Sequence, residues 1–338
     1  MTTAASRTIL LTPEQQDQLC KVLNGGNYRV VQVPHARIAA EAENCRVALF
    51  PKRGKCLVQG KGASDFVEFV LEPLVLGEAR QGYETVHDPR IAEAHLGVDE
   101  SGKGDYFGPM ITAAAYVDAG ICEKLRELDV KDSKRYTSEK RLLEVAGALR
   151  RLLGRRFSLV PVGPAAYNRL CYRMRSVNTI LAWSHARAIE NLLDTVPDCP
   201  RAISDQFGNA AQVKRALMNK GRKIELEQRP RAESDPAVAA ASVLARAAFV
   251  YAVKNLEESY GVPFPKGASA AVRGAAVRLV AARGPSVLLK TAKCHFRTTD
   301  LVLAEAGHDR TALGTEGQAV SKPVDRSRFR RPRNVSPE

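Results

Sequence analysis

Apolar and polar residues near the N-terminus follow patterns typical of a helix packed on a small sheet. Thr12 and Gln15 have the spacing of a capping box, which predicts a helix from this point to the run Asn24-Gly25-Gly26. The turn-forming residues 51–54 separate two apolar runs and predict a β-hairpin with a basic tip. The expected strands of this part are residues 28–33, 46–50 and 55–59, with a second helix at 65–71. Together these elements predict a small α+β unit.

From residue 91 onward, strand and helix patterns alternate. Short apolar runs predict strands around Val98 and at residues 110–117, 201–205 and 224–228. Apolar residues at helical spacing predict helices at residues 139–153, 177–193 and 237–251, with two more between 268 and 292. Such an alternation is typical of an α/β domain built on a mixed sheet.

Changes in composition divide the chain into four segments. Proline and glycine punctuate the stretch between the two folded parts, as is typical of a linker. After Gly307 the apolar periodicity ends, and residues 326–333 hold a cluster of arginines typical of a disordered basic tail. We therefore expect an N-terminal domain at residues 1–75, a linker at 76–92, an α/β domain at 93–305 and a tail at 306–338.

The composition of the chain indicates which partners it binds and in which cellular compartment it works. The chain has 338 residues, 45% of them hydrophobic, and a net charge of +14, which favours nucleic acid or another polyanion as partner. No apolar run is expected to span a membrane, and the N-terminus lacks the pattern of a secretion signal. The seven cysteines are scattered, which favours a reducing compartment over a zinc site or disulfides. We expect a cytoplasmic monomer without membrane association or an obligate protein partner.

The run from Gly97 to Pro109, GVDESGKGDYFGP, carries the first chemical signal. Its apolar start ends in the adjacent acids Asp99 and Glu100, which repel each other unless a cation lies close to both. The glycines that flank Lys103 let the backbone approach a phosphate or a sugar beside a positive charge. An isolated pair of acids is more often part of an exposed turn. The whole run, however, favours metal-dependent phosphoryl transfer on a polyanion.

Further acids follow other predicted elements. Asp205 ends the strand at 201–205, and Glu233 and Asp235 come just before the alanine-rich helix. Because α/β folds place their sites at the carboxyl edge of the sheet, we expect these acids to converge with the first pair. Converging carboxylates suit Mg²⁺ or Mn²⁺. Two such ions about 4 Å apart can hold the attacking water and the leaving oxygen of a phosphodiester.

Residues 97–109 resemble the signature of the type 2 ribonucleases H, and GKGDYFGP resembles its form in the ribonuclease HIII branch. Segments similar to other motifs of the family follow in the family's order: KDSK at 131–134, LAWSHARAIENL at 181–192, SDQF at 204–207, AVAAASVLAR at 237–246 and FPKGAS at 264–269. LVQGKG at 57–62 resembles part of the TATA-binding-protein-like domain at the N-terminus of ribonuclease HIII. The resemblance covers roughly residues 10–303.

The resemblance implies a ribonuclease H-like mixed sheet flanked by helices, preceded by a small α+β domain similar to the TATA-binding protein. It implies an endonuclease that hydrolyses the RNA strand of an RNA–DNA hybrid with two divalent ions, Mg²⁺ or Mn²⁺, and leaves 5′-phosphate and 3′-hydroxyl ends. The implied metal-binding acids are Asp99, Glu100 and Asp205, with Glu233 as the fourth catalytic acid and Asp235 as its alternative.

The same resemblance assigns substrate recognition to Gly102, Lys103 and Gly104. This segment is similar to the one that contacts ribose 2′-hydroxyls, the groups that distinguish RNA from DNA. Other type 2 enzymes have arginine where Lys103 stands, which favours the HIII branch. Two other hypotheses are a nucleic-acid-binding module without catalysis and a different metal nuclease, such as a DNA nuclease or a resolvase. The complete set of acids argues against the first, and the glycine–lysine–glycine segment argues against the second.

Several polar residues have weaker assignments. His185 and Trp183 lie on an apolar helix, where packing is expected more often than catalysis. Lys131 and Lys134 either contact phosphate or are solvated, and the sequence favours neither. His295 has no assignable role.

Overall fold

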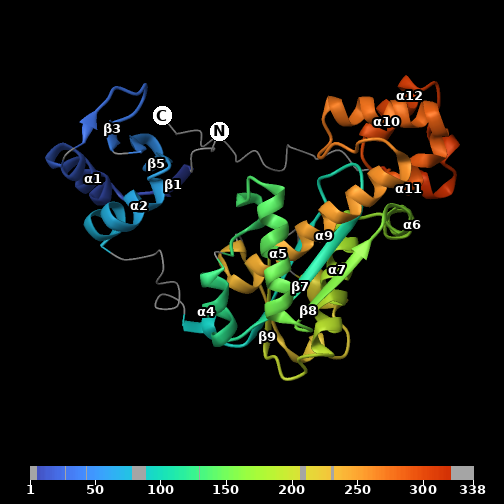
Figure 1. Cartoon of the computed structure of the whole chain (residues 1–338), viewed down its shortest axis with the longest axis horizontal. Helices are drawn as coiled ribbons and strands as arrows, with labels where there is room; N and C mark the ends of the chain where they lie inside the picture. The colour runs from blue at the N-terminus through green and yellow to red at the C-terminus, as the bar shows by residue number, and fades with distance from the viewer. Residues whose placement is uncertain are drawn as a thin grey trace, which may run out of the picture. The chain divides into compact units, whose positions relative to one another are not determined.

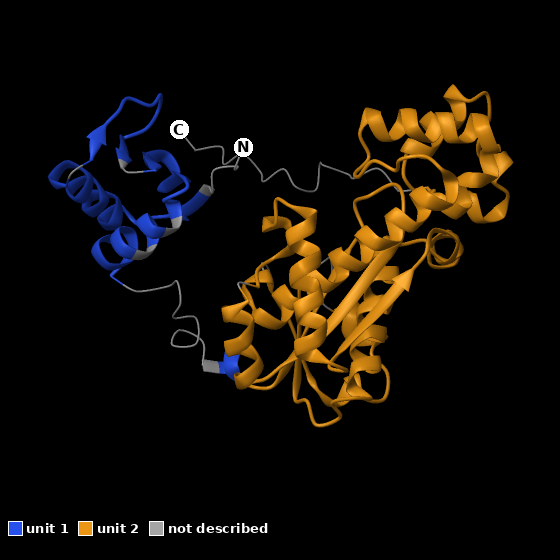
Figure 2. Cartoon of the chain, in the orientation of Figure 1, with its two compact units in different colours: residues 1–92 blue, residues 93–338 orange. Residues whose placement is uncertain are grey.

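The computed structural model of the chain describes residues 6–26, 28–42, 44–77, 89–128, 130–205, 211–229 and 232–320. The chain divides into two compact units, residues 1–92 and 93–338 (Figure 2). The division falls at residue 93, where we expected the α/β domain to begin.

The N-terminal unit is a five-stranded antiparallel sheet with its helices packed against it (Figure 1). Its strand order is β1-β5-β4-β3-β2. The strands are β1 (Ser6–Leu10), β2 (Arg29–Val30), β3 (Ile38–Ala42), β4 (Cys45–Phe50) and β5 (Lys55–Gly60). The helices are α1 (Pro13–Gly25) and α2 (Ala63–Phe66), and α2 continues as a π-helix over Val67–Leu76. The structure thus confirms a small α+β domain at the N-terminus.

Local sequence signals explain two elements of this unit. Thr12 caps α1, because its hydroxyl accepts a bond from the Gln15 amide while the Gln15 side chain accepts one from the Thr12 amide. Gly54 closes the β4–β5 hairpin with a φ of 60°, and a Cβ there would lie 2.3 Å from the Leu11 carbonyl oxygen. The strand expected at 28–33 shortens to β2. The helix expected at 65–71 lengthens, because α2 begins at Ala63 and the π-helix continues to Leu76.

The second unit is built on a five-stranded mixed sheet with the order β10-β9-β6-β7-β8. Its strands are β6 (His95–Ser101), β7 (Met110–Val117), β8 (Phe157–Val162), β9 (Arg201–Asp205) and β10 (Glu225–Arg229). β6 runs antiparallel to β7 but parallel to β9, which confirms the mixed sheet. β8 is not among the predicted strands, because Pro161 interrupts its apolar pattern. The sheet accommodates this proline because β8 is an edge strand.

Helices cover both faces of this sheet and form a lobe at one end of it (Figure 1). They are α4 (Ala119–Glu127), α5 (Glu139–Leu153), α6 (Pro164–Met174), α7 (Val177–Leu193), α8 (Ala211–Ala216), α9 (Pro236–Tyr260), α10 (Ala270–Arg283), α11 (Leu288–Thr291) and α12 (Thr298–Glu305). One core packs α5 and α9 against the sheet, and a second packs α6 and α7 against it. A third core joins the end of α9 to α10, α11 and α12.

α9 corrects one expectation about apolar segments. It has 25 residues and is long and apolar enough to cross a membrane, contrary to the expectation that no apolar run has this length. However, 72% of its most apolar window is buried inside the protein. Its alanines allow a close approach to β6, where a Cβ on Gly97 would lie 2.1 Å from the Ala237 carbonyl carbon. The apolar composition of α9 is therefore that of a core helix.

Residues 306–320 differ from the disordered tail expected after residue 305. They contain two 3-10 turns, and Leu313 is buried in the third core. The Arg310 side chain explains this order, because it pairs with the Asp300 carboxylate and donates to several backbone carbonyl groups. The arginine-rich residues 326–333 lie outside the described residues.

Candidate active site

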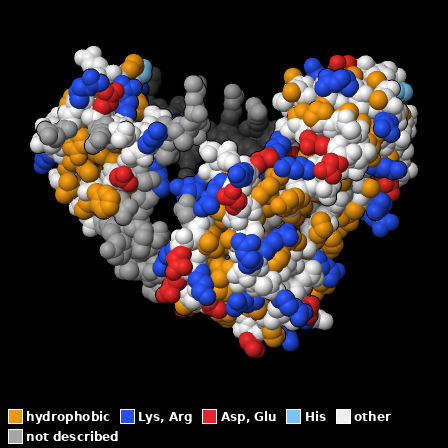
Figure 3. Space-filling model, viewed as in Figure 1, with side chains coloured by type: hydrophobic (Ala, Val, Ile, Leu, Met, Phe, Trp, Pro, Cys, Tyr) orange, Lys and Arg blue, Asp and Glu red, His pale blue; other side chains and the backbone are white. Residues whose placement is uncertain are grey.

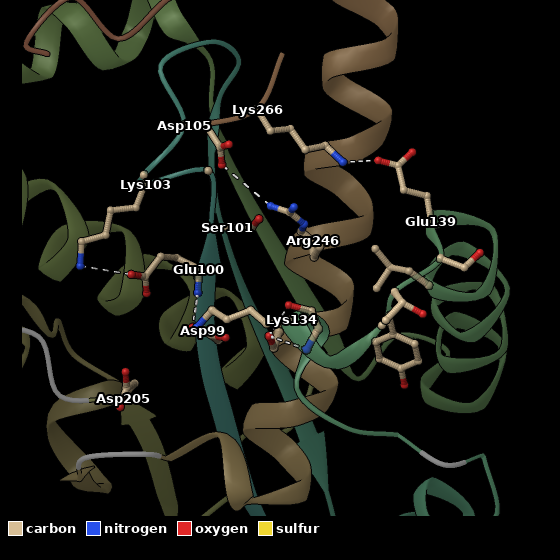
Figure 4. A pocket seen from close by; sticks show the side chains of 18 residues that line it. Asp99, Glu100, Ser101, Lys103, Asp105, Lys134, Glu139, Asp205, Arg246 and Lys266 are labelled. Carbon is tan, nitrogen blue, oxygen red and sulfur yellow. Dashed lines mark hydrogen bonds and ion pairs between the residues drawn. The ribbon is translucent and has the colours of Figure 1, made fainter. Parts of the chain in front are cut away.

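A cavity of about 770 Å³ lies at the carboxyl end of β6 and β9 (Figure 4). Asp99, Glu100 and Asp205 all line it. The parallel pairing of β6 with β9 brings Asp205 to the same edge of the sheet as the other two acids. The remaining lining residues come from the loop after β6, the segment 133–139, α5, α9 and Lys266. Three of the predicted acids thus share one cavity with predicted substrate-binding residues.

Asp99 and Glu100 are neighbours on β6 and therefore point to opposite faces of the sheet. Gly97, two residues before Asp99, lies against α9, so Asp99 faces this helix, with Ser242 beside its carboxylate. Glu100 faces α7 and bonds to His185. The strand thus separates the two acids and gives each a different set of neighbours.

The two acids also differ in their affinity for a proton. Burial, followed by repulsion from Glu100, raises the pKa of Asp99 to about 7. Burial also acts to raise the pKa of Glu100, but His185 and Lys103 outweigh it and bring this pKa to about 2. A divalent cation beside Asp99 would offset both the burial and the repulsion. By charge and by oxygen donors, the site therefore fits a divalent metal ion.

His185 belongs to the site, although its sequence pattern indicates only a place in the core. It is fully buried, as expected, but its Nε2 lies 3.0 Å from Glu100 Oε2 and its Nδ1 lies 3.0 Å from Ser204 Oγ. The ring therefore holds the Glu100 carboxylate in place. The sequence shows a histidine on an apolar helix, which predicts burial but does not predict that the side chain contacts Glu100. Trp183 packs against the apolar core and is half-buried.

Asp205 occupies the last position of β9 and is half-buried. Its carboxylate lies apart from those of Asp99 and Glu100 (Figure 4). Within the described ranges, no three His, Cys, Asp or Glu side chains are placed to hold one metal ion. Residues 206–210, which include the end of the SDQF motif, lie outside the described residues. The three acids share a cavity but do not form a closed coordination shell.

The structure argues against Asp235 as a metal ligand. Asp235 is fully buried, caps α9 by accepting from the amides of Ala237 and Val238, and lies 3.1 Å from His95 Nε2. Because these donors occupy the carboxylate, the role of Asp235 is to cap the helix. Glu233 is half-buried in the turn before α9 and is not one of the residues that line the cavity. Its role as the fourth acid stays a prediction.

The segment Gly102-Lys103-Gly104 borders the cavity. Gly102 has a φ of 87°, and a Cβ there would lie 2.2 Å from the Pro109 carbonyl oxygen, so the position requires glycine. A Cβ on Gly104 would meet open space. Lys103 is partly exposed, and its Nζ lies 3.5 Å from Glu100 Oε1. The backbone at Gly104 is therefore exposed to a ligand in the cavity, whereas Gly102 is buried against the other arm of the loop.

Basic side chains share the cavity with the acids. The four that line it are Lys103, Lys134, Arg246 and Lys266. Lys266 is ion-paired with Glu139, the first residue of α5, and Lys254 Nζ lies 3.9 Å from the same carboxylate. Lys131, by contrast, lies over the ring of Tyr136 and does not line the cavity. The cavity thus offers acids for a cation together with cations for a phosphate.

Known proteins similar to this chain are ribonucleases H. The sequence model of the family described as Ribonuclease HII matches residues 96–299. Ribonuclease HIII of Chlamydia pneumoniae is 39% identical over 297 residues, which cover 86% of this chain and 96% of that protein. Ribonuclease HIII of Protochlamydia amoebophila is 36% identical over 291 residues, or 86% of this chain and 94% of the relative.

Solved structures agree with these relatives. Bst-RNase HIII in complex with Mn²⁺ has a TM-score of 0.62 and 28% identity, with 89% of this chain and 99% of that chain covered. Ribonuclease H2 from Pyrococcus horikoshii OT3 shares the fold, with a TM-score of 0.53 at 21% identity over 62% of this chain and 96% of that one. The chain therefore belongs to the ribonuclease HIII family of the type 2 ribonucleases H, and it is a ribonuclease H enzyme.

Proposed function

We propose that this enzyme hydrolyses the RNA strand of RNA–DNA hybrids with two divalent ions, Mg²⁺ or Mn²⁺, and leaves 5′-phosphate and 3′-hydroxyl ends. One observation carries the proposal: a single cavity is lined by the three predicted metal-binding carboxylates, by the glycine–lysine–glycine segment and, besides Lys103 of that segment, by three further basic side chains. The Mn²⁺ complex of the related Bst-RNase HIII supports a divalent metal.

Asp99, Glu100 and Asp205 hold the ions in this proposal, with Glu233 as the fourth acid. Two bound divalent ions supply a more acidic water and stabilise the leaving oxygen of the phosphodiester. The protein's own contribution is to keep the ligands ionised and oriented. His185 does this for Glu100, because the hydrogen bond of its buried ring favours the carboxylate over the neutral acid.

Recognition of RNA rests on the segment 102–104. Peptide groups beside Gly104 can approach a ribose closely, because this glycine is exposed and faces open space, and the 2′-hydroxyl both donates and accepts hydrogen bonds. Lys134 and Arg246 are placed to contact phosphate oxygens, which positions the strand without reading its sequence. The cavity thus has separate groups for the sugar and for the phosphate.

The N-terminal unit supplies a second surface for nucleic acid. The tip of its β4–β5 hairpin carries the exposed side chains of Lys52, Arg53 and Lys55. Arg46 and Gln59 are paired across the same two strands and are also exposed. Lys and Arg side chains are spread over the visible surface of both units (Figure 3). Such groups bind phosphates without sequence preference. We also propose that the protein acts as a cytoplasmic monomer, where its seven free cysteines stay reduced.

The test is a cleavage assay on labelled hybrid, single-stranded RNA and duplex DNA, with and without Mg²⁺. Asp99→Asn and Asp205→Asn are expected to lower hybrid cleavage by more than about a hundredfold, since even partners of metal ligands are worth tenfold to a hundredfold. Hybrid affinity is expected to change little, because it rests on basic groups that contact phosphate. Asp198→Asn is the matched control, because Asp198 is exposed and does not line the cavity.

The outcomes separate the hypotheses. Normal turnover by Asp205→Asn would refute the site. Binding of hybrid without cleavage by the wild type in Mg²⁺ would favour the nucleic-acid-binding module, and cleavage of duplex DNA would favour a DNA nuclease. For the fourth acid, Glu233→Gln is expected to lose activity at unchanged stability. Asp235→Asn is expected to lower the melting temperature first, because it weakens a buried helix cap.

A further inference from the structure

Lys293 is fully buried, and no other lysine in the described ranges is buried to this degree. It follows α11 and lies between Ala292 and Cys294, which both belong to the third core. Burial lowers its pKa to about 7. The charge of Asp105 offsets only part of this burial, and Lys293 forms no ion pair with a carboxylate of the described residues. Because burying an ammonium group is costly, a fold retains one where it makes specific hydrogen bonds.

The hydrogen bonds that Lys293 donates all go to the loop between β6 and β7. Its Nζ donates to the carbonyl oxygens of three successive residues: Phe107 (3.2 Å), Gly108 (2.6 Å) and Pro109 (3.4 Å). Its backbone amide donates to the Tyr106 carbonyl oxygen, and the Gly108 amide donates to the Thr291 carbonyl oxygen. The returning arm of the loop, residues 106–109, is therefore attached to the C-terminal lobe.

The attached arm supports the segment proposed to contact ribose. The Pro109 carbonyl oxygen, which Lys293 holds, is also the atom that would lie 2.2 Å from a Cβ on Gly102. The two arms of the loop therefore touch at this point. Nearer the tip, Asp105 accepts a hydrogen bond of 2.7 Å from the Gly267 amide. Movement of the returning arm would displace Gly102 and the residues after it.

We propose that Lys293 is a positioning residue for ribose recognition. By holding the carbonyl groups of residues 107–109, it fixes the backbone of Gly102–Gly104 where a 2′-hydroxyl can bond to it, and so sets the preference for hybrid over duplex DNA. This proposal rests on the proposed function, in which that segment contacts ribose. Lys293 is fully buried and acts only through the loop.

The test compares affinity for hybrid with affinity for duplex DNA of the same sequence. Fluorescently labelled duplexes are titrated in EDTA, so that nothing is cleaved. Lys293→Met keeps the length of the side chain and removes every donor, whereas Lys293→Gln keeps two donors without the charge. Lys290→Met is the matched control, because Lys290 is exposed three positions earlier and loses the same charge.

We expect Lys293→Met to weaken hybrid binding about five- to tenfold, as for the loss of one or two hydrogen bonds to ribose. Affinity for duplex DNA should stay at the wild-type value, because the phosphate contacts are unchanged. Lys293→Gln should lie between the wild type and Lys293→Met. Lys290→Met should leave the hybrid-to-DNA ratio at its wild-type value.

Thermal unfolding is measured in parallel. A folded Lys293→Met with the wild-type hybrid-to-DNA ratio overturns the proposal, even if its melting temperature falls, because that result shows a purely structural lysine. If Lys293→Met does not fold, the ratio for Lys293→Gln decides in its place. Failure of the proposed function can be told apart from failure of this proposal, because the wild type itself would then show no preference for hybrid over duplex DNA.

Discussion

Replacing His185 by alanine should weaken catalysis through Glu100 without removing a metal ligand. In the wild type, His185 Nε2 lies 3.0 Å from Glu100 Oε2, and the ring is fully buried between α7 and the sheet. The substitution removes this donor and leaves space beside the carboxylate. Glu100 then loses both the contact that fixes its orientation and the neighbour that does most to lower its pKa.

The size of the expected loss of catalysis follows from the one hydrogen bond that is removed. A hydrogen bond to a charged group contributes about 1.5–3 kcal/mol, and 1.4 kcal/mol is tenfold. We therefore expect kcat/KM for hybrid to fall about tenfold to a hundredfold, the range found for partners of metal ligands. The affinity for Mn²⁺ should fall with it. His185→Gln should recover part of the loss, because its amide can still donate to Glu100.

The assay is steady-state cleavage of a labelled hybrid across a Mn²⁺ titration. Thermal unfolding, measured in parallel, separates weaker catalysis from loss of folded protein. His308→Ala is the control, because His308 is an exposed histidine in the same unit. A folded His185→Ala with the wild-type kcat/KM and the wild-type Mn²⁺ dependence would show that His185 is only a packing residue.

Two further predictions concern charge. Glu139→Gln frees Lys266 and Lys254 from a shared carboxylate, so the slope of log affinity against log salt should steepen by about 0.9 for each additional phosphate that these lysines neutralise. An unchanged slope would mean that neither lysine reaches the nucleic acid. Burial and two nearby cations lower the pKa of His295 in the folded protein to about 4. The unfolded chain therefore binds more protons than the folded protein between pH 6.5 and 4. Acidification through this range should lower the free energy of unfolding by up to about 3 kcal/mol. Urea unfolding of His295→Phe should show a smaller loss on acidification, and an equal loss would contradict this shift.

The elements that could be predicted are those whose signals are local. The expected bounds of α5 and α7 match the structure, because Ser138 and Ser176 cap their first turns and the apolar spacing runs over several turns. α4, α6 and α12 have only 9, 11 and 8 residues, which is too short for a clear period.

Site residues with a local sequence signal could likewise be predicted, and those that depend on distant contacts could not. Asp99, Glu100 and Asp205 could be selected because each ends a recognisable strand, and parallel pairing then brings the strands together. His185 and Lys293 could not, because their partners lie 85 and 185 residues away in the sequence. Only the packing of α7 on the sheet and of the C-terminal lobe on the β6–β7 loop creates those contacts.

The alternation of side chains along β6 has a consequence for how this site can evolve. Because Asp99 faces α9 and Glu100 faces α7, the immediate surroundings of the two acids share no helix. A change on α7 reshapes the neighbourhood of one acid and leaves the contacts of the other intact. The charges of the two acids still interact across the strand, because Glu100 raises the pKa of Asp99 and His185 lowers it, so substitutions on the two helices are expected to couple through charge and not through shared contacts. The strand therefore separates the contacts of the two acids but not their charges, so descendants of this sequence can change the packing around one acid while the contacts of the other stay intact.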